Sequence, residues 1–208
     1  MMCMIKKRAN SPEQKALRRQ QILLAARRRF EKASFEEVNL NLIAADVGMT
    51  KAALYRYFRN KETLFLALFV VSLDELVNAA EAETLDKPLA SAITHTLLAN
   101  PMYCKLSAIL HTILERNLTL EEASDFKTTL LSLLGKYAEM ITRHSSLDLP
   151  QAIRLLMQVQ EAVIGCWHMS HPTGAIAEAI SQPSLQIFRQ DFDSTLLSHI
   201  ERLIPDQN

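Results

Sequence analysis

The most chemically informative part of the 208-residue sequence is residues 39–58, where a few polar side chains stand next to very small ones. Lys51 is followed directly by Ala52 and Ala53, and Tyr55 comes two residues later. A lysine ammonium can donate hydrogen bonds to guanine O6 and N7, and small neighbours leave room for a helix to enter a groove. This combination is suited to contacting the major groove of a nucleic acid.

Two short helices are expected to position these side chains. Asn39 is a good N-cap for a helix over 40–47, and Gly48 permits the positive φ that a sharp turn needs. Thr50 can cap a second helix over 51–58. A short helix, a turn with glycine and a second short helix form a helix-turn-helix, which places its second helix in the major groove.

The apolar residues of this motif have the spacing that its core requires. Ile43, Ala44 and Val47 face inward from the first helix, and Ala44 is small enough for a close approach. Leu54 and Phe58, four residues apart, anchor the second helix. Lys51 and Tyr55 are thereby turned toward solvent.

The run from Ile43 to Phe65 resembles the DNA-binding region of TetR-family transcriptional regulators, and the detailed match covers roughly residues 11–65. The resemblance implies that Lys51, Ala52 and Ala53 lie nearest the base edges. It also implies that Tyr55 reaches a phosphate and that Lys61 holds another one at the start of the next helix, where free N–H groups attract anions.

Further DNA contacts are expected on either side of this surface. Asn41 and Thr50 are candidates for contacts to phosphates or bases. A basic arm over residues 1–10 contains Lys6, Lys7 and Arg8, which can reach the minor groove or the backbone. The chain departs from the family pattern at Ser34, where a glycine is common, so a left-handed backbone there would cost ~1–2 kcal/mol.

Charge is distributed unevenly, although the 23 Lys and Arg balance the 23 Asp and Glu. Residues 1–63 have 14 basic and 6 acidic side chains, whereas residues 64–208 have 9 and 17. The basic segment is therefore expected to meet a polyanion, and the acidic remainder is not.

Composition predicts an all-α fold, because hydrophobic residues make up 49% and only 4 glycines are available for tight turns. Prolines, caps and 3.6-residue periodicity predict about nine helices. These span residues 11–32, 40–47, 51–58, 61–83, 88–99, 101–117, 119–144, 149–170 and 184–204. We expect a DNA-binding domain over 1–60 and a helical effector-binding and dimerisation domain over 61–208.

Several classes of protein are excluded by the sequence. The longest apolar run, 64–73, is too short for a bilayer span of ~20 residues, and no signal-peptide core precedes it, so we expect a cytoplasmic protein with no membrane partner. Cys3, Cys104 and Cys166 match neither a disulfide framework nor a metal motif. His168 and His171 lack an evident third ligand, and no catalytic motif is present. We therefore expect no metal, no cofactor and no enzyme activity.

The last two predicted helices carry apolar stripes that could pack within one subunit or between subunits. The resemblance implies the second arrangement, a homodimer built on a four-helix bundle. The expected interface residues are Ile164, Phe188, Phe192 and Leu196. A dimer would contact two half-sites about 34–36 Å apart, which predicts a palindromic double-stranded DNA operator.

Members of the family usually bind a small molecule among the middle helices. Polar, aromatic and soft residues in apolar helices are candidates for lining such a site, although each could equally be an ordinary core or surface residue. They are Met102, Tyr103, His111, Tyr137, Gln158, Trp167 and His168. The resemblance predicts a repressor released by a small-molecule effector. The alternative is a DNA-binding regulator controlled by a partner protein or by no small molecule.

Overall fold

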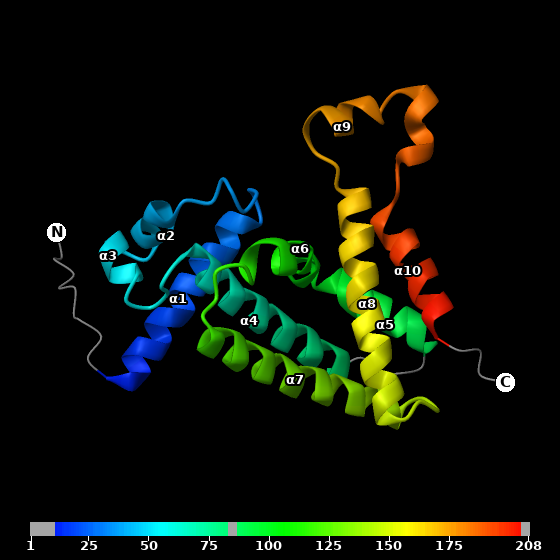
Figure 1. The fold of residues 1–208 in the computed structure, drawn as a ribbon, viewed down its shortest axis with the longest axis horizontal. Helices are drawn as coiled ribbons and strands as arrows, with labels where there is room; N and C mark the ends of the chain where they lie inside the picture. Colours follow the sequence, from blue (N-terminus) through cyan, green and yellow to red (C-terminus); the bar gives the residue numbers. More distant parts are fainter. Residues whose placement is uncertain (1–10, 83–86, 205–208) are drawn as a thin grey trace. The chain divides into compact units, whose positions relative to one another are not determined.

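The computed structural model describes residues 11–82 and 87–204, and this part of the chain is α-helical with no strand (Figure 1). The all-α prediction is confirmed. Ten α-helices are present in the described ranges rather than about nine, together with a π-helical turn and a 3-10 helix. The elements are α1 (Pro12–Phe30), α2 (Leu40–Asp46), α3 (Lys51–Leu54), α4 (Lys61–Ala82), α5 (Leu89–Ala99), α6 (Pro101–Ile109), η1 (Leu110–Leu114), α7 (Leu120–Arg143), α8 (Leu149–Ser170), α9 (Gly174–Ala179), η2 (Pro183–Phe188) and α10 (Phe192–Leu203).

The chain forms two compact units, Met1–Leu68 and Phe69–Asn208. The division falls inside α4, eight residues after the domain end expected at residue 60. The reason is that the first turns of α4 complete the core of the first unit. The ring of Phe65 meets Phe30 and Phe35 edge to face, with centroids 5.0 Å apart in both pairs.

The first unit is built on α1, whose start was predicted correctly. The hydroxyl of Ser11 accepts a hydrogen bond from the backbone N–H of Gln14 at 3.2 Å, and Pro12 occupies the first turn, where its missing N–H is not needed. Ile22 and Phe30 are buried, whereas Leu17 is 57% exposed.

Helix α8 is the central element of the second unit, where it packs against α6, α7 and α10. Two capping boxes fix where the long helices begin, one formed by Thr119 and Glu122 at α7 and the other by Asp148 and Gln151 at α8. These local signals explain why the predicted limits of α7 and α8 agree closely with the observed ones.

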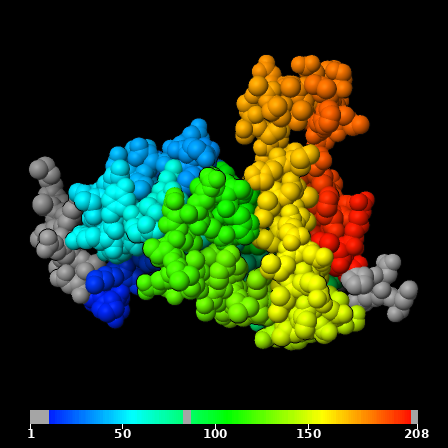
Figure 2. Space-filling view, viewed as in Figure 1, coloured from blue at the N-terminus to red at the C-terminus, as the bar shows by residue number. Residues whose placement is uncertain are grey.

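The expected helix over 184–204 is wrong in its first half. Pro183–Phe188 instead form the 3-10 helix η2, and α-helix resumes only at Phe192. The short helix α9 (Gly174–Ala179) lies before this range and was not predicted. Residues 171–191 stand away from α8 and α10 in Figure 2, and neither α9 nor η2 has a buried residue. Without burial, the apolar periodicity of this segment is not enough to hold an α-helix.

The predicted helix over 101–117 also ends early. Helix α6 stops at Ile109 and continues as the π-helical turn η1. The carboxylate of Glu115 directly after this turn contacts His111 Nδ1 at 3.0 Å and accepts a hydrogen bond from Lys127 Nζ at 2.7 Å. The end of η1 is thereby attached to α7.

Helix α4 is long and apolar enough, by length and composition, to cross a bilayer. Its apolar side chains have another use, because half of that window is buried within the protein. Leu64, Phe65, Leu68, Phe69, Leu73 and Leu76 are all buried. This burial is typical of a core helix.

Candidate functional site

The helix-turn-helix predicted over residues 39–58 is present in the first unit. Asn39 accepts a hydrogen bond through Oδ1 from the backbone N–H of Asn41 at 2.8 Å, which caps α2. Gly48 has a φ of 65°, so the glycine supplies the left-handed turn. Thr50 Oγ1 accepts from the backbone N–H of Ala53 at 3.2 Å and caps α3.

Helix α3 presents the face that the sequence predicted. Leu54 and Phe58 are buried beneath it, whereas Lys51 and Ala52 are exposed and Tyr55 is 42% exposed. The ammonium of Lys51 lies 5.8 Å from the ring centroid of Tyr55. The surface therefore combines one cation, one phenol and a small alanine, which are suited to approach a groove closely and to donate hydrogen bonds there.

The remaining predicted residues of this motif lie beside that face. Ala53 is half-buried, and Asn41 and Thr50 are exposed at the starts of α2 and α3. Both side chains are suited to donate a hydrogen bond to a phosphate. Lys6, Lys7 and Arg8 lie outside the described residues.

Lys61 is engaged differently from what the sequence predicted. Its ammonium donates hydrogen bonds to the carbonyl of Phe35 and, at 3.4 Å, to that of Glu36, and it lies 4.2 Å from the Phe35 ring centroid. Partial burial lowers the pKa of Lys61, opposed by the charges of Glu36 and Glu62. The side chain holds the loop after α1, so a phosphate would have to compete with these carbonyls.

Arginines of α1 brace the motif, a role that the sequence did not suggest. Arg29 donates to both carboxylate oxygens of Asp46 at 2.6 and 2.7 Å, joining α1 to the end of α2. Arg18 donates to the carbonyl of Val47 at 3.2 Å. The pKa of Asp46 is lowered by the Arg29 hydrogen bond and by the charges of Arg29 and Arg28, against desolvation. These contacts fix α2 and the turn on α1.

Ser34 does not need the left-handed backbone considered above, because no non-glycine residue in the described ranges has a positive φ. The backbone N–H of Ser34 donates to Glu37 Oε2 at 2.8 Å, and the backbone N–H of Glu37 contacts Ser34 Oγ at 3.4 Å. A reciprocal side-chain cap therefore replaces the glycine turn.

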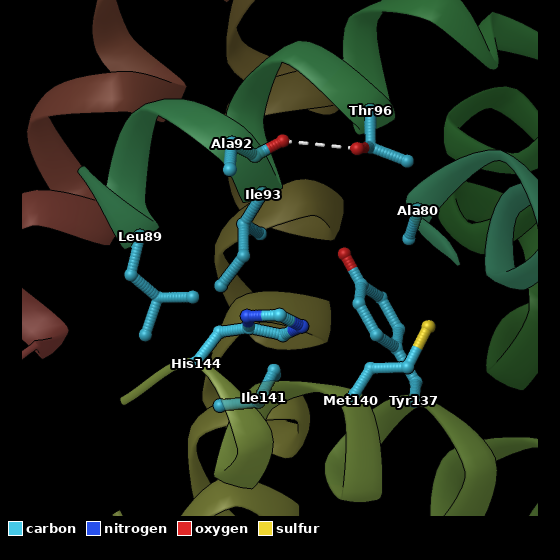
Figure 3. Close-up of a pocket in the computed structure, with 9 residues that line it drawn as sticks. All are labelled: Ala80, Leu89, Ala92, Ile93, Thr96, Tyr137, Met140, Ile141 and His144. Carbon is cyan, nitrogen blue, oxygen red and sulfur yellow. Dashed lines mark hydrogen bonds between the residues drawn. The ribbon is translucent and has the colours of Figure 1, made fainter. Parts of the chain in front are cut away.

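The second unit contains a small apolar cavity between α4, α5 and α7. Its lining residues are Ala80, Leu89, Ala92, Ile93, Thr96, Tyr137, Met140, Ile141 and His144 (Figure 3). Tyr137 directs its hydroxyl between Ile93 and Ala80, while Thr96 donates to the carbonyl of Ala92 at 2.9 Å. The cavity volume is about 30 Å³, which is room for roughly two water molecules.

A buried polar cluster lies between α6 and α8. Tyr103 donates its hydroxyl hydrogen to Gln160 Oε1. Another polar atom of the cluster, Gln160 Nε2, is buried with no hydrogen-bond partner among the described residues. Burial raises the pKa of Tyr103, the charges of Cys104 and Tyr137 reinforce this shift, and a side-chain hydrogen bond with Ser107 opposes it. Tyr103 is therefore neutral near pH 7.

Comparison with known proteins assigns both units. The model of "Bacterial regulatory proteins, tetR family" matches residues 22–68, and the "Tetracyclin repressor-like, C-terminal domain" matches residues 66–205. The second match alone covers more than half of the chain. The chain belongs to the TetR family. Regulators of this family bind DNA and function as dimers.

Curated relatives match part of this TetR-family chain. It is 32% identical over 75 residues to the HTH-type transcriptional repressor Rv1474c of Mycobacterium tuberculosis, covering 36% of this chain and 40% of that protein. It is 40% identical over 53 residues to the HTH-type transcriptional repressor AcnR of Corynebacterium diphtheriae, covering 26% and 28%. The matched regions thus span less than half the length of these relatives.

Solved structures share the fold of almost the whole TetR-family chain. The fatty acid degradation regulator FadR from Bacillus halodurans has a TM-score of 0.52 at 15% identity, covering 97% of this chain and 98% of its own. A TetR transcriptional regulator from Rhodococcus sp. RHA1 has a TM-score of 0.58 at 16% identity, covering 92% and 97%. At such low identity these comparisons bear on the fold alone.

The structure does not bring the seven predicted ligand-binding residues of this TetR-family chain into one site. Tyr103 and Tyr137 are both buried. The others are dispersed: Met102 is half-buried, His111 is exposed on η1, Gln158 is exposed on α8, Trp167 stacks on His171, and His168 contacts the carbonyl of Ala108 through Nε2 at 3.0 Å.

Sequence reasoning missed Ser107 and Gln160 as members of the polar cluster. Neither residue is among the seven predicted ligand-binding residues. A polar residue on the inward face of an apolar helix was the available signal. The hydrogen bond from Tyr103 to Gln160 joins residues 57 positions apart, so the sequence alone could not indicate it.

The four predicted interface residues occupy different environments. Leu196 is fully buried within the protomer, so it cannot contact a second chain. Ile164 and Phe192 are half-buried, and the Phe192 ring packs edge-on against Trp167 with centroids 5.3 Å apart. Phe188 lies on η2 and is 58% exposed.

Within the described ranges, no group of three or more His, Cys, Asp or Glu side chains is arranged to hold a metal ion. Cys104 and Cys166 are buried free thiols, and burial raises the pKa of Cys104 to about 12. Both thiols are therefore protonated packing groups.

Proposed function

We propose that this TetR-family chain is a cytoplasmic transcriptional repressor that binds a palindromic operator as a homodimer and is released by a small-molecule effector. The observation that carries the DNA-binding part is the exposed face of α3, where Lys51 and Ala52 stand above buried Leu54 and Phe58. Both curated relatives are described as transcriptional repressors, which supports the sign of regulation.

The exposed side of α8 and α10 is the proposed dimer surface. A groove of about 520 Å³ runs between these helices and is lined by Gln158, Glu161, Ala162, Gly165, Cys166, Met169, Gln190, His199, Arg202 and Leu203. Small residues such as Ala162 and Gly165 allow a second helix to approach closely. Met157 and Met169 expose apolar surface beside them, which supports burial by a partner.

The effector would act by differential affinity. In one state of the proposed dimer, the two DNA-binding units match the two half-sites, and in another state they do not. A molecule that binds the second unit more tightly in the non-matching state increases the population of that state and so weakens DNA binding. The proposed dimer then links ligand binding to operator release, because both DNA-binding units must fit the same duplex.

A second candidate is regulation by a partner protein or without a small molecule. The size of the cavity between α4, α5 and α7 favours it, because room for roughly two water molecules cannot hold a drug-sized ligand without opening. Thermal shifts across a metabolite panel distinguish the two candidates. Stabilisation by at least one metabolite supports an effector, and none across the panel supports the partner-controlled regulator.

Selection of genomic DNA fragments by the purified protein, with and without small-molecule cell extract, tests the proposal. We expect enrichment of palindromic fragments that the extract releases. Ala52→Glu places an anion on the exposed α3 face and should abolish enrichment, whereas Ala175→Glu makes the same change on exposed α9 and should not. Enrichment that survives Ala52→Glu would contradict the assignment of α3.

A further inference from the structure

Helix α1 has two exposed leucines on the side that faces away from the core of the first unit. Leu17 is 57% exposed and Leu24 is 48% exposed. They are seven residues apart, which is about two turns, so they lie on one face of the helix. Ala26, on the opposite face, is fully buried, and α1 packs against α2. A contact made through the leucines would therefore leave the helix-turn-helix undisturbed.

Polar residues complete this exposed face of α1, which we call the α1 stripe. Each of them lies three or four residues from one of the two leucines, the spacing that places side chains on one face of a helix. They are Glu13, Gln20, Gln21 and Arg28, all exposed. The stripe thus has an acid at its start, a base at its end, and leucines and amides between them.

The α1 stripe is complementary to a second copy of itself. Its residues are arranged symmetrically about the point between Gln20 and Gln21. When two copies of α1 pack antiparallel about a two-fold axis at this point, each leucine meets the other leucine of the second copy, and each acid meets a base. Gln21 Oε1 accepts from Arg18 Nη1 at 2.8 Å, so the Gln21 amide nitrogen is the group that can donate to Gln20 of the second copy.

The charges of the stripe select the antiparallel orientation. A parallel pair would place Glu13 against Glu13 and Arg28 against Arg28, and like charges repel. A hydrogen bond with Ser11 lowers the pKa of Glu13, so this carboxylate is charged near pH 7. Exposed ion pairs add little affinity, so their main effect is on orientation and register.

The stripe is too small to hold two molecules together in free solution. A stable interface buries ~1,200 Å² or more of total surface, whereas this contact is built on four half-exposed leucines from two helices. Two molecules that are bound side by side on one DNA duplex have an effective concentration of about the millimolar range, at which a weak contact forms. The two first units of one dimer are already connected through their second units, so the stripe adds a connection between dimers.

We propose that antiparallel contact between α1 stripes joins neighbouring repressor dimers on one DNA duplex, so that adjacent operators are filled cooperatively. The inference rests on the proposed function, because it requires a dimer that binds palindromic DNA.

Equilibrium titrations of DNA with one and with two selected palindromes test this contact. The spacing between the palindromes is varied in single base pairs over one helical turn, because the two stripes can meet only at matching angles around the duplex. At the best spacing, the second dimer should bind ~10-fold more tightly than the first. At a spacing half a turn away, this cooperativity should be absent. Equal affinity for both dimers at every spacing would overturn the proposal.

Charge reversals test the antiparallel register. Glu13→Arg and Arg28→Glu should each abolish most of the cooperativity, and the double variant should restore it because the ion pairs form again with reversed charges. Each value is compared with the same variant's affinity for one palindrome, since the charge changes alter general attraction to DNA. Glu139→Arg, at an exposed position of α7, is the control and should keep the cooperativity of the wild type. A double variant that stays non-cooperative would contradict the register.

Leu17→Gln tests the apolar part of the stripe. Because Leu17 is mostly exposed, the variant should keep its melting temperature and its affinity for one palindrome while it loses cooperativity on two. Leu131→Gln is the matched control, because Leu131 is 64% exposed on α7. A Leu17→Gln variant that remains as cooperative as the wild type would overturn the proposal. A loss that is equally large on one palindrome would show that Leu17 acts within each dimer.

Binding to a single palindrome separates this inference from the proposed function. Wild-type protein that binds one palindrome but shows no cooperativity on two would overturn the α1 contact alone. Wild-type protein that binds no palindrome would overturn the proposed function, and this inference with it.

Discussion

The ammonium of Lys61 donates hydrogen bonds to two backbone carbonyls of the loop after α1. The side chain therefore stabilises the folded first unit when no DNA is bound. Lys61→Ala should therefore lower the free energy of unfolding by about 1 kcal/mol, a value discounted because the ammonium is partly exposed. It should also weaken binding to all DNA sequences about equally if the side chain exchanges these carbonyls for a phosphate.

Urea denaturation of Lys61→Ala beside Lys51→Ala measures this effect. Lys51 makes only the long contact with the Tyr55 ring among the interactions described above, so its replacement should leave the urea midpoint unchanged. A Lys61→Ala midpoint equal to that of the wild type would show that the loop carbonyls do not depend on this side chain.

The Asp46–Arg29 pair gives the head a pH-dependent contact. The pKa of Asp46 is lowered in the folded protein by Arg29, so the pair stabilises the fold fully above the ordinary carboxyl pKa of about 3.9. That contribution is lost as the pH falls through the lowered folded value. Asp46→Asn should therefore melt below the wild type at pH 6, with a difference that shrinks below pH 4. A difference that stays constant from pH 6 to pH 3 would argue against the ionised pair.

At the scale of elements, the turn between α2 and α3 depends on the backbone of Gly48. Its φ is 65°, and an added Cβ would meet no atom within 4 Å, so Gly48→Ala brings backbone strain of ~1–2 kcal/mol without a steric clash. Because the turn sets the angle of α3, operator affinity should fall as well. Gly48→Asn should lose less, since asparagine tolerates this conformation.

Gly174 provides a matched control, because its φ is 58° and its surroundings are equally open. Gly174→Ala should cost similar stability and leave operator affinity unchanged, because residue 174 lies in the second unit. Operator titrations at concentrations where each variant is folded make the comparison. Equal loss of DNA affinity in Gly48→Ala and Gly174→Ala would show that the turn between α2 and α3 is not the cause of the loss.

Most element limits could be predicted because their causes are local. Ser11, Asn39, Thr50, Thr119 and Asp148 cap helices through side-chain contacts to residues two or three positions away. The failure over 184–191 has the opposite cause. The apolar spacing there suits a helix, but the segment has no surface to bury against, and burial cannot be inferred from spacing.

The candidate site also contains residues whose positions follow from local spacing and residues whose positions depend on the tertiary fold. The exposed face of α3 follows from the spacing of Leu54 and Phe58 within one motif, so the sequence predicted it. The partners of Lys61, Arg29 and Gln160 lie 26, 17 and 57 positions away, and only the tertiary fold brings them together. Long-range pairing therefore marks the limit of what the sequence could predict.

At the scale of the whole molecule, the neutral total charge conceals a division between the two units. The basic excess over residues 1–63 belongs to the head that carries α3, and the acidic excess over 64–208 belongs mainly to the helical unit. Phosphate contacts release counter-ions, so DNA affinity should fall steeply with salt concentration, and the acidic unit should not bind the duplex.

Equilibrium titration of a selected palindromic fragment and its scrambled counterpart tests the central claim that α3 recognises DNA sequence through Lys51. The wild type should prefer the selected fragment by ~10³-fold or more. Lys51→Ala should lose about 1–3 kcal/mol on that fragment and much less on the scrambled one. Equal losses on both fragments, or no preference by the wild type, would contradict the account.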